Sequence, residues 1–398
     1  MKYALSCLLA MLFVSYCYCQ TGVIAGSAAT GPGEVLRVSA GIRLPKDTVM
    51  RDQLLGSLRG WLGQKDRSEF VEAGDRPGLT PLMNEMDRLG GFTCYLTNVV
   101  ALEGDQFRIQ FAYMGQRDTV PELRACCTVM AKQKDGKFFF FSPLKEYTGD
   151  WKTRTIGNCV FHYKKEINKK KAAEYQKRVA FYDSKLTGSP QAIDFYCCGG
   201  FAEASQLVGL DYKLEYNSWT YSAYSGFAAD RTVVVCGEKW IDGFSDWNRH
   251  DTWHERLSQI VHSPTINRPV DEACAYLYGG SWQIYSPEDI LRLFREYAAS
   301  HPDADWVALY KDGVDFVPGP KILKISYAIN ALIVERLEKE KGFSAVLELL
   351  NCGKKEKGDA NYFAAIKRLT GVDEPQYNQF VWKLIRAGTH QSVAPGRG

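Results

Sequence analysis

The sequence lacks a run of about 18 apolar residues, the length that a membrane-spanning helix needs, so we predict no transmembrane segment. It also lacks an excess of charge of one sign. Its 49 basic residues face 46 acidic ones, and this balance indicates neither nucleic acid nor an anionic membrane as a partner. Sustained heptads and a glycine period are missing, which excludes coiled-coil arrays and collagen. Apolar and aromatic residues are plentiful, at 45% and 13%, and they exclude long disorder for most of the chain.

The first 19 residues are typical of a removable export signal. Lys2 supplies a positive charge, and residues 4–14 form an almost unbroken apolar run. Cys17 and Cys19 are small residues at the two places that favour cleavage after Cys19. The alternative is a lipoprotein signal with Cys17 as the acylated residue, although Tyr16 matches the preceding place poorly. Both interpretations predict an exported protein, periplasmic or secreted.

The cysteines outside that segment do not predict a pairing pattern. Twelve cysteines, less Cys7, Cys17 and Cys19, leave nine, and an odd number requires at least one free thiol or an outside partner. No CxxC spacing occurs, so a zinc site built from cysteines is not favoured. We interpret most of the nine as small buried apolar residues in strands.

Caps, turns and apolar patterns predict two domains after the export segment. Residues 20–187 are expected to form an α+β domain, with helices followed by strands in a curved sheet, loosely similar to the NTF2-like cone by element order alone. Asp47 is expected to cap a helix that ends near Leu62, and Thr80-Pro81 to start a second helix. Gly188-Ser189-Pro190 has the composition of a linker. Residues 191–388 are expected to be mainly helical with a small sheet.

The remaining elements follow from the same patterns. The expected strands cover residues 92–102, 106–114, 126–132, 137–142, 158–163, 192–197 and 232–236. The expected helices cover residues 169–186, 200–208, 290–299, 323–340, 343–350, 361–369 and 377–385.

One short segment carries recognisable chemistry. His250 and His254 are spaced i, i+4, so on a helix both imidazoles lie on one face and can reach one metal ion. With six histidines in the chain, chance would produce such a pair roughly 0.09 times. After a further 17 residues comes Glu272, a candidate third ligand. Two imidazoles, one carboxylate and a position left for water are typical of a catalytic Zn2+ site. The structural alternative is a pair of surface histidines on an amphipathic helix.

This segment resembles the gluzincin zinc metallopeptidases, and most closely their peptidase MA-like group. The family pattern is HExxH, a spacer of about 18 residues, and a glutamate in a helix like the segment Asp271-Glu272-Ala273-Cys274-Ala275-Tyr276 of this chain. The resemblance covers about residues 190–388. It implies a zincin-like fold with Zn2+ held by His250, His254 and Glu272, and hydrolysis of peptide bonds in a peptide or protein substrate by a metal-activated water.

The chain departs from the family at one residue, because Asp251 stands where the family has glutamate. In the family that acid takes a proton from the attacking water and passes it to the leaving amine. The sequence therefore leaves two hypotheses open. One is an exported zinc-dependent metallopeptidase with Asp251 as its catalytic acid–base group. The other is a catalytically impaired pseudo-peptidase that acts as a cell-envelope binding or assembly module.

Overall fold

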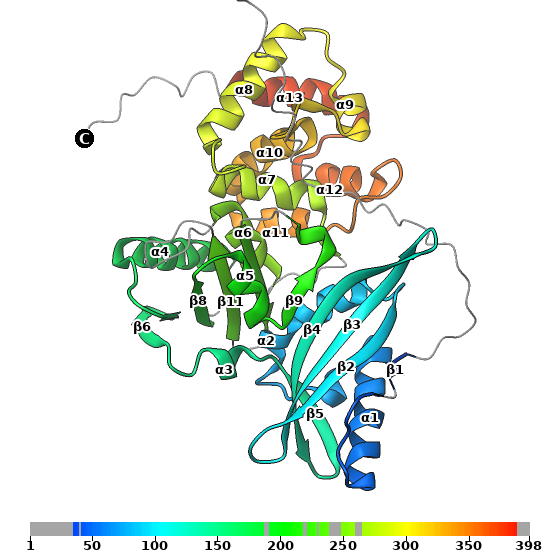
Figure 1. Ribbon diagram of the computed structural model, residues 1–398. Coiled ribbons are helices and arrows are strands. Elements are labelled where there is room, and N and C mark those ends of the chain that lie inside the picture. The colour runs from blue at the N-terminus through cyan, green and yellow to red at the C-terminus, as the bar shows by residue number, and fades with distance from the viewer. Residues whose placement is uncertain are drawn as a thin grey trace, which may run out of the picture. The chain divides into compact units, whose positions relative to one another are not determined.

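The computed structural model describes residues 35–39, 41–186, 191–217, 221–228, 231–238, 248–258 and 265–387 (Figure 1). The protein is mixed α/β with open sheets. The chain divides into two compact units, Gly26–Trp247 and a unit whose described part begins at Asn248. The predicted export signal and the Gly188-Ser189-Pro190 segment lie outside the described residues. Among the helices that are described, none combines the length and the apolar character needed to cross a membrane.

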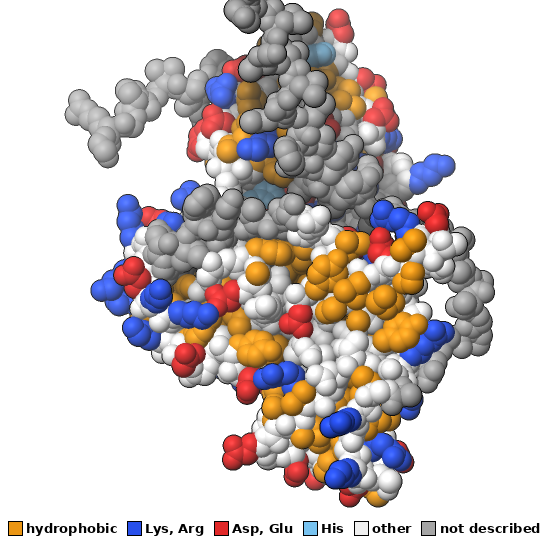
Figure 2. Space-filling view, in the orientation of Figure 1, with side chains coloured by type: hydrophobic (Ala, Val, Ile, Leu, Met, Phe, Trp, Pro, Cys, Tyr) orange, Lys and Arg blue, Asp and Glu red, His pale blue; other side chains and the backbone are white. Residues whose placement is uncertain are grey.

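The first sheet belongs to the unit Gly26–Trp247. Its strands run in the order β1-β2-β3-β4-β5, and β9 pairs with a further part of β4. Alternate residues of β2–β4 point into a core that helices α1 and α2 close, with Leu54, Trp61 and Phe111 fully buried. Figure 2 shows hydrophobic side chains gathered over β3, β4 and β9 on the face toward the viewer. The elements are β1 (Arg37–Val38), α1 (Thr48–Gly63), η1 (Ser68–Phe70), α2 (Arg76–Arg88), β2 (Thr93–Ala101), β3 (Gln106–Arg117), β4 (Val120–Lys134), β5 (Lys137–Phe141), α3 (Leu144–Tyr147), β9 (Leu210–Lys213) and η2 (Leu214–Tyr216).

The second sheet of the same unit has the order β10-β11-β8-β7-β6, with β7, β8 and β11 parallel to one another. Parallel neighbours need a crossover, and α4 makes the one between β7 and β8. Tyr175 and Val179 of α4 are buried against Phe161 and Phe195 of the sheet. The elements are β6 (Lys152–Ile156), β7 (Cys159–Tyr163), α4 (Lys169–Leu186), β8 (Ala192–Cys198), α5 (Phe201–Leu207), β10 (Tyr221–Phe227) and β11 (Arg231–Glu238).

The described part of the second unit consists of helices and one short hairpin. Helix α10 is buried on nearly every side, as a central helix is, and packs against α7 and α11. The buried amide of Asn330 in α10 accepts a hydrogen bond from the hydroxyl of Tyr362 at 2.9 Å. The elements are α6 (Arg249–Ser258), α7 (Arg268–Gly279), α8 (Pro287–Ser300), α9 (Trp306–Asp312), β12 (Asp315–Val317), β13 (Leu323–Lys324), α10 (Ile325–Lys341), α11 (Phe343–Leu350), α12 (Ala360–Thr370) and α13 (Glu374–Ala387).

Most expected elements are confirmed. The Asp47 carboxylate caps α1 by accepting a hydrogen bond from the Met50 N–H at 2.8 Å. Helices α4 and α11 begin and end at the predicted residues. The expected start of α2 is wrong, because the helix begins at Arg76 with Pro77 in its first turn, and Pro81 lies inside it. Both prolines satisfy the sequence rule for a helix start, and the rule alone does not choose between them.

Along the chain, the boundary between the two compact units falls between residues 247 and 248, whereas the sequence predicted a boundary near Gly188. The pairing of the strands explains this difference. Strand β8 follows the expected linker and pairs in parallel with β7, which precedes it, so that Phe195 lies beside Phe161. Strand β9 pairs with β4 of the first sheet. Residues on either side of Gly188 therefore share both larger sheets.

Seven of the nine described cysteines are buried. Seven of the nine lie in strands, in agreement with their interpretation as small apolar residues. Burial raises the pKa of the Cys94 thiol to about 12, which keeps this group protonated at neutral pH.

Candidate metal centre

The candidate site lies between α6 and α7 in the second unit. Asn248 starts α6 by accepting hydrogen bonds from the N–H of His250, through its side chain, and of Thr252, through its carbonyl. Trp253 and Leu257 bury one side of α6, which turns the histidine face toward α7. The last turn of α7 comes very close to the start of α6. A Cβ on Gly279 would lie 2.8 Å from the backbone nitrogen of His250, so glycine is required there.

Three predicted ligands come together at this contact. One ligand atom from each of His250, His254 and Glu272 lies within 4.8 Å of the other two. The Nε2 atom of His250 lies 3.2 Å from Glu272 Oε2, and the Nε2 atom of His254 lies 3.9 Å from Oε1. Ligand atoms on a tetrahedral zinc ion are about 3.4 Å apart when each bond is about 2.1 Å long. The distance between His250 and Glu272 is close to this value, and His254 lies near enough to complete a three-ligand cluster.

The other nitrogen of each imidazole has a hydrogen-bond partner. The Nδ1 atom of His250 lies 2.8 Å from the carbonyl oxygen of Gly280, which only accepts, so Nδ1 donates. The Nδ1 atom of His254 lies 2.7 Å from Asp271 Oδ1. When metal-binding histidines donate through one nitrogen in this way, the ring orientation is fixed and the second nitrogen faces the metal. His254 Nε2 is buried and has no hydrogen-bond partner, as expected for a nitrogen whose partner is a metal ion.

Interactions within the site keep Glu272 in its charged form. Burial alone would raise the pKa of Glu272, but the hydrogen bond with His250 and the positive charges of His254 and Arg268 lower it to about 2. Burial would lower the pKa of His250, and its interactions with Glu272 and the Gly280 carbonyl more than offset this and raise it. Glu272 is therefore ionised, and its charge is stabilised by His250, His254 and Arg268.

Asp251, the predicted acid–base residue, lies in the first turn of α6 outside the three-ligand cluster. It is half-buried, and its charge contributes to raising the pKa of His250. One turn later on the same side is Glu255. Loss of solvent, followed by the charge of Asp251, raises the pKa of Glu255 to about 8. Two acids thus accompany the two histidines along α6, each directly following a histidine in sequence.

Sequence reasoning missed three contributors to this site. Gly280 acts through its carbonyl oxygen, and no side-chain pattern reveals such a role. Arg268 contacts both carboxylates of α7, with Nη1 lying 3.1 Å from Asp271 Oδ2 and Nη2 paired with Glu272 Oε1. Gly279 provides the close helix contact. The i, i+3 and i, i+4 spacings of Arg268 from the two acids were the one available signal.

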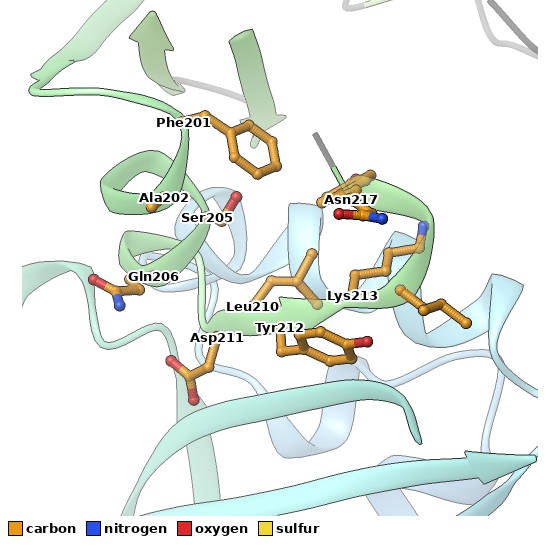
Figure 3. A pocket seen from close by; sticks show the side chains of 11 residues that line it. Phe201, Ala202, Ser205, Gln206, Leu210, Asp211, Tyr212, Lys213 and Asn217 are labelled. Atoms are coloured by element: carbon orange, nitrogen blue, oxygen red, sulfur yellow. The ribbon is translucent and has the colours of Figure 1, made fainter. Parts of the chain in front are cut away.

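The unit Gly26–Trp247 has a separate pocket of about 480 Å3 beside α5 and β9 (Figure 3). Two of its polar lining residues, Lys213 and Ser205, have partners outside the lining. Lys213 forms a buried ion pair with Glu85 at 2.5 Å, and Ser205 is hydrogen-bonded to the Tyr224 hydroxyl at 2.8 Å. The pocket therefore presents no arrangement of groups comparable to the cluster between α6 and α7.

Comparison with known proteins adds no assignment. No protein-family model matches the chain, and no curated protein matches it. The geometry of the site and the spacing of its three residues are therefore the features of the chain that indicate a function.

Proposed function

We propose that this chain is a zinc-dependent hydrolase of peptide bonds, with the metal held by His250, His254 and Glu272. The convergence of the three ligand atoms within 4.8 Å, together with the buried, unpartnered Nε2 of His254, is the observation that carries the proposal. The gluzincin-like spacing of the three residues supports a peptidase over other zinc hydrolases. Under this proposal the predicted export signal places the activity in the periplasm or outside the cell.

The residues of the chain have distinct roles in the proposal. Bound zinc supplies the Lewis acid that acidifies water and polarises the scissile carbonyl. Asp271 keeps His254 in the tautomer whose Nε2 accepts a metal, and the Gly280 carbonyl does the same for His250. Asp251 accepts the proton of the attacking water and returns it to the leaving amine.

The surrounding elements are in keeping with the same proposal. Strand β11 precedes the histidine helix in sequence, and helices α8–α13 follow the glutamate helix, which is the element order of the zincin-like fold. For the first sheet and its helices we propose a curved arrangement like the NTF2-like cone, on the basis of element order.

The length of Asp251 favours a second candidate, a pseudo-peptidase that binds metal and a partner in the cell envelope without hydrolysis. Aspartate is one methylene shorter than the glutamate of the family. A base has to lie within about 2.6–3.2 Å of the water that it deprotonates, directly or through one water. A displacement of about 1 Å costs on the order of 100-fold in rate.

The metal centre is tested by zinc content and by chelator-sensitive hydrolysis of a mixed peptide pool. The wild-type chain is expected to bind one Zn2+ per molecule and to lose hydrolysis on chelation. Glu272→Gln is expected to lose most of its zinc, while Glu288→Gln, a change in the first turn of α8, is expected to retain it. A wild-type chain that is folded but binds no zinc refutes the proposal.

Asp251→Glu separates the two candidates. If the chain is a peptidase limited by the reach of its base, the glutamate variant should hydrolyse peptides on the order of 100-fold faster at equal zinc content. Asp251→Asn should abolish the activity of the wild type while the zinc stays bound. Zinc-loaded wild-type and glutamate proteins that are both inert would favour the pseudo-peptidase.

A further inference from the structure

Arg268 lies in the first turn of α7, ahead of the two carboxylates that serve the metal centre. Its guanidinium contacts Asp271 Oδ2 through Nη1 at 3.1 Å and Glu272 Oε1 through Nη2. One side chain thus contacts both the carboxylate that orients His254 and the carboxylate that faces the metal position.

We propose that Arg268 is a positioning residue that makes Glu272 bind the metal through one oxygen only. This inference rests on the proposed metal centre and adds to it the way in which the third ligand coordinates. The metal-facing carboxylate has two oxygens, and the geometry assigns each of them a different partner.

The distances support this division. Glu272 Oε2 lies 3.2 Å from His250 Nε2, close to the separation of about 3.4 Å expected for two ligands of one tetrahedral zinc ion. Glu272 Oε1 is engaged by the guanidinium and lies farther from an imidazole, at 3.9 Å from His254 Nε2. Oε2 is therefore the metal ligand, and Oε1 is retained by Arg268. With one oxygen bound, the fourth position of the metal stays open for water.

The burial of its partners distinguishes Arg268 from an ordinary surface ion pair. Arg292 on α8 provides the comparison, because it too pairs with two acids of its own helix and its side chain is equally exposed, at 56% against 55%. The partners of Arg292 are 43% and 59% exposed, whereas Asp271 and Glu272 are 5% and 10% exposed. Charge pairs with exposed partners are screened by water, and those with buried partners are screened much less.

The shape of the arginine side chain also suits it to position Glu272. Its planar guanidinium presents two parallel donors, and one of them reaches each carboxylate. An ammonium group is a point charge and lacks this fixed geometry. Arg268→Lys should therefore keep the charge but loosen the hold on Oε1, and Arg268→Met should remove both.

The experiment replaces zinc by Co2+ and records its visible absorption, which reports coordination geometry and does not depend on catalysis. The full-length wild type and three variants, Arg268→Met, Arg268→Lys and Arg292→Met, are titrated with CoCl2 at equal protein concentration. Circular dichroism confirms that each variant is folded. Absorption by Co2+ weakens as its coordination number rises from four to five.

We expect an intense, four-coordinate spectrum for wild type and for Arg292→Met. Arg268→Met should absorb at about half that intensity or less, because Glu272 then binds through both oxygens, and Arg268→Lys should lie between the two. If cobalt-loaded Arg268→Met has the wild-type spectrum, Arg268 has no positioning role, although the metal centre stands. If the folded wild type binds no cobalt, the metal centre fails and the role of Arg268 fails with it.

Discussion

At the residue scale, the buried carboxylate of Asp271 contacts three side chains within the candidate site. Its Oδ1 atom receives hydrogen bonds from the Trp253 indole at 3.0 Å and from His254 at 2.7 Å, and its Oδ2 atom faces Arg268. Three donors on one acceptor satisfy a charged group that is only 5% exposed. The carboxylate also joins α7 to two residues of α6, the core residue Trp253 and the proposed metal ligand His254.

We expect Asp271→Asn to weaken zinc binding by about 10–100-fold while the protein stays folded. The amide has a single acceptor oxygen and adds a donor that faces the Nδ1–H of His254, so the tautomer is no longer enforced. Competition with a chromophoric chelator measures the dissociation constant. Asp303→Asn, at an exposed position after α8, is the control and should bind zinc as the wild type does. Equal affinity in Asp271→Asn would show that this carboxylate has no part in the site.

The convergence of the three proposed ligand residues was predictable from the sequence, whereas their surroundings were not. Residue type and spacing single out His250, His254 and Glu272. Helical periodicity brings the two histidines together on one face. The carbonyl of Gly280 and the forked contact of Arg268 depend on how two helices meet, and this is set by packing rather than by residue type.

At the scale of elements, the contact between α6 and α7 decides whether the histidines meet the glutamate. Gly279 is the critical position, since a Cβ there would lie 2.8–2.9 Å from three backbone atoms of Arg249 and His250. Backbone atoms cannot rotate away as a side chain can, so the helices would have to separate. Separating the helices would move His250 and His254 away from Glu272, and metal–ligand bonds are only about 2.0–2.2 Å long.

We therefore predict that Gly279→Ala destabilises the protein by about 1–3 kcal/mol and lowers its affinity for zinc. Gly56→Ala is the matched control, because this exposed glycine of α1 has nothing within 4 Å of its added Cβ. That change should stabilise by about 0.5–1 kcal/mol, since alanine suits a helix interior better than glycine does. Urea denaturation of both variants measures the two free energies of unfolding, and effects of the same sign would contradict the argument.

Elements with strong local patterns were predicted well, and elements defined by their partners were not. Helix α4 has a clear apolar stripe, and its ends match the prediction. Strand β9 has four residues, and only its pairing with Ala125, Cys126 and Cys127 of β4 makes it a strand. Strand β6 is exposed along most of its length and has no apolar alternation to reveal it.

At the scale of the whole molecule, we expect bound zinc to crosslink α6 and α7 and so to raise the free energy of unfolding. A ligand that binds the native state at 100 times its dissociation constant stabilises it by about 2.7 kcal/mol. For a unit of this size, such a change raises the melting temperature by about 5–10 °C. We expect this rise for wild type and none for Glu272→Gln.

Hydrogen–deuterium exchange locates the effect. Zinc should slow exchange in α6 and α7, while strands β2–β4 of the other compact unit should exchange as before. Slowing that is uniform along the chain, or equal in the Glu272→Gln variant, would indicate nonspecific metal binding rather than a site between these helices.

The place of β9 in the first sheet constrains how the protein emerges from the ribosome. Strands β2–β5 are complete by Phe141, yet the edge of β4 at Ala125–Cys127 waits for β9, which ends at Lys213. At about 5–20 residues per second, the 79 residues from Lys134 to Lys213 take about 4–16 s to synthesise. During that interval the nascent chain exposes an unpaired strand edge, which is a template for pairing with another chain and so for aggregation. A fragment ending at residue 187 should carry the same exposed edge permanently and be recovered as aggregate, whereas one ending at residue 247 should be soluble.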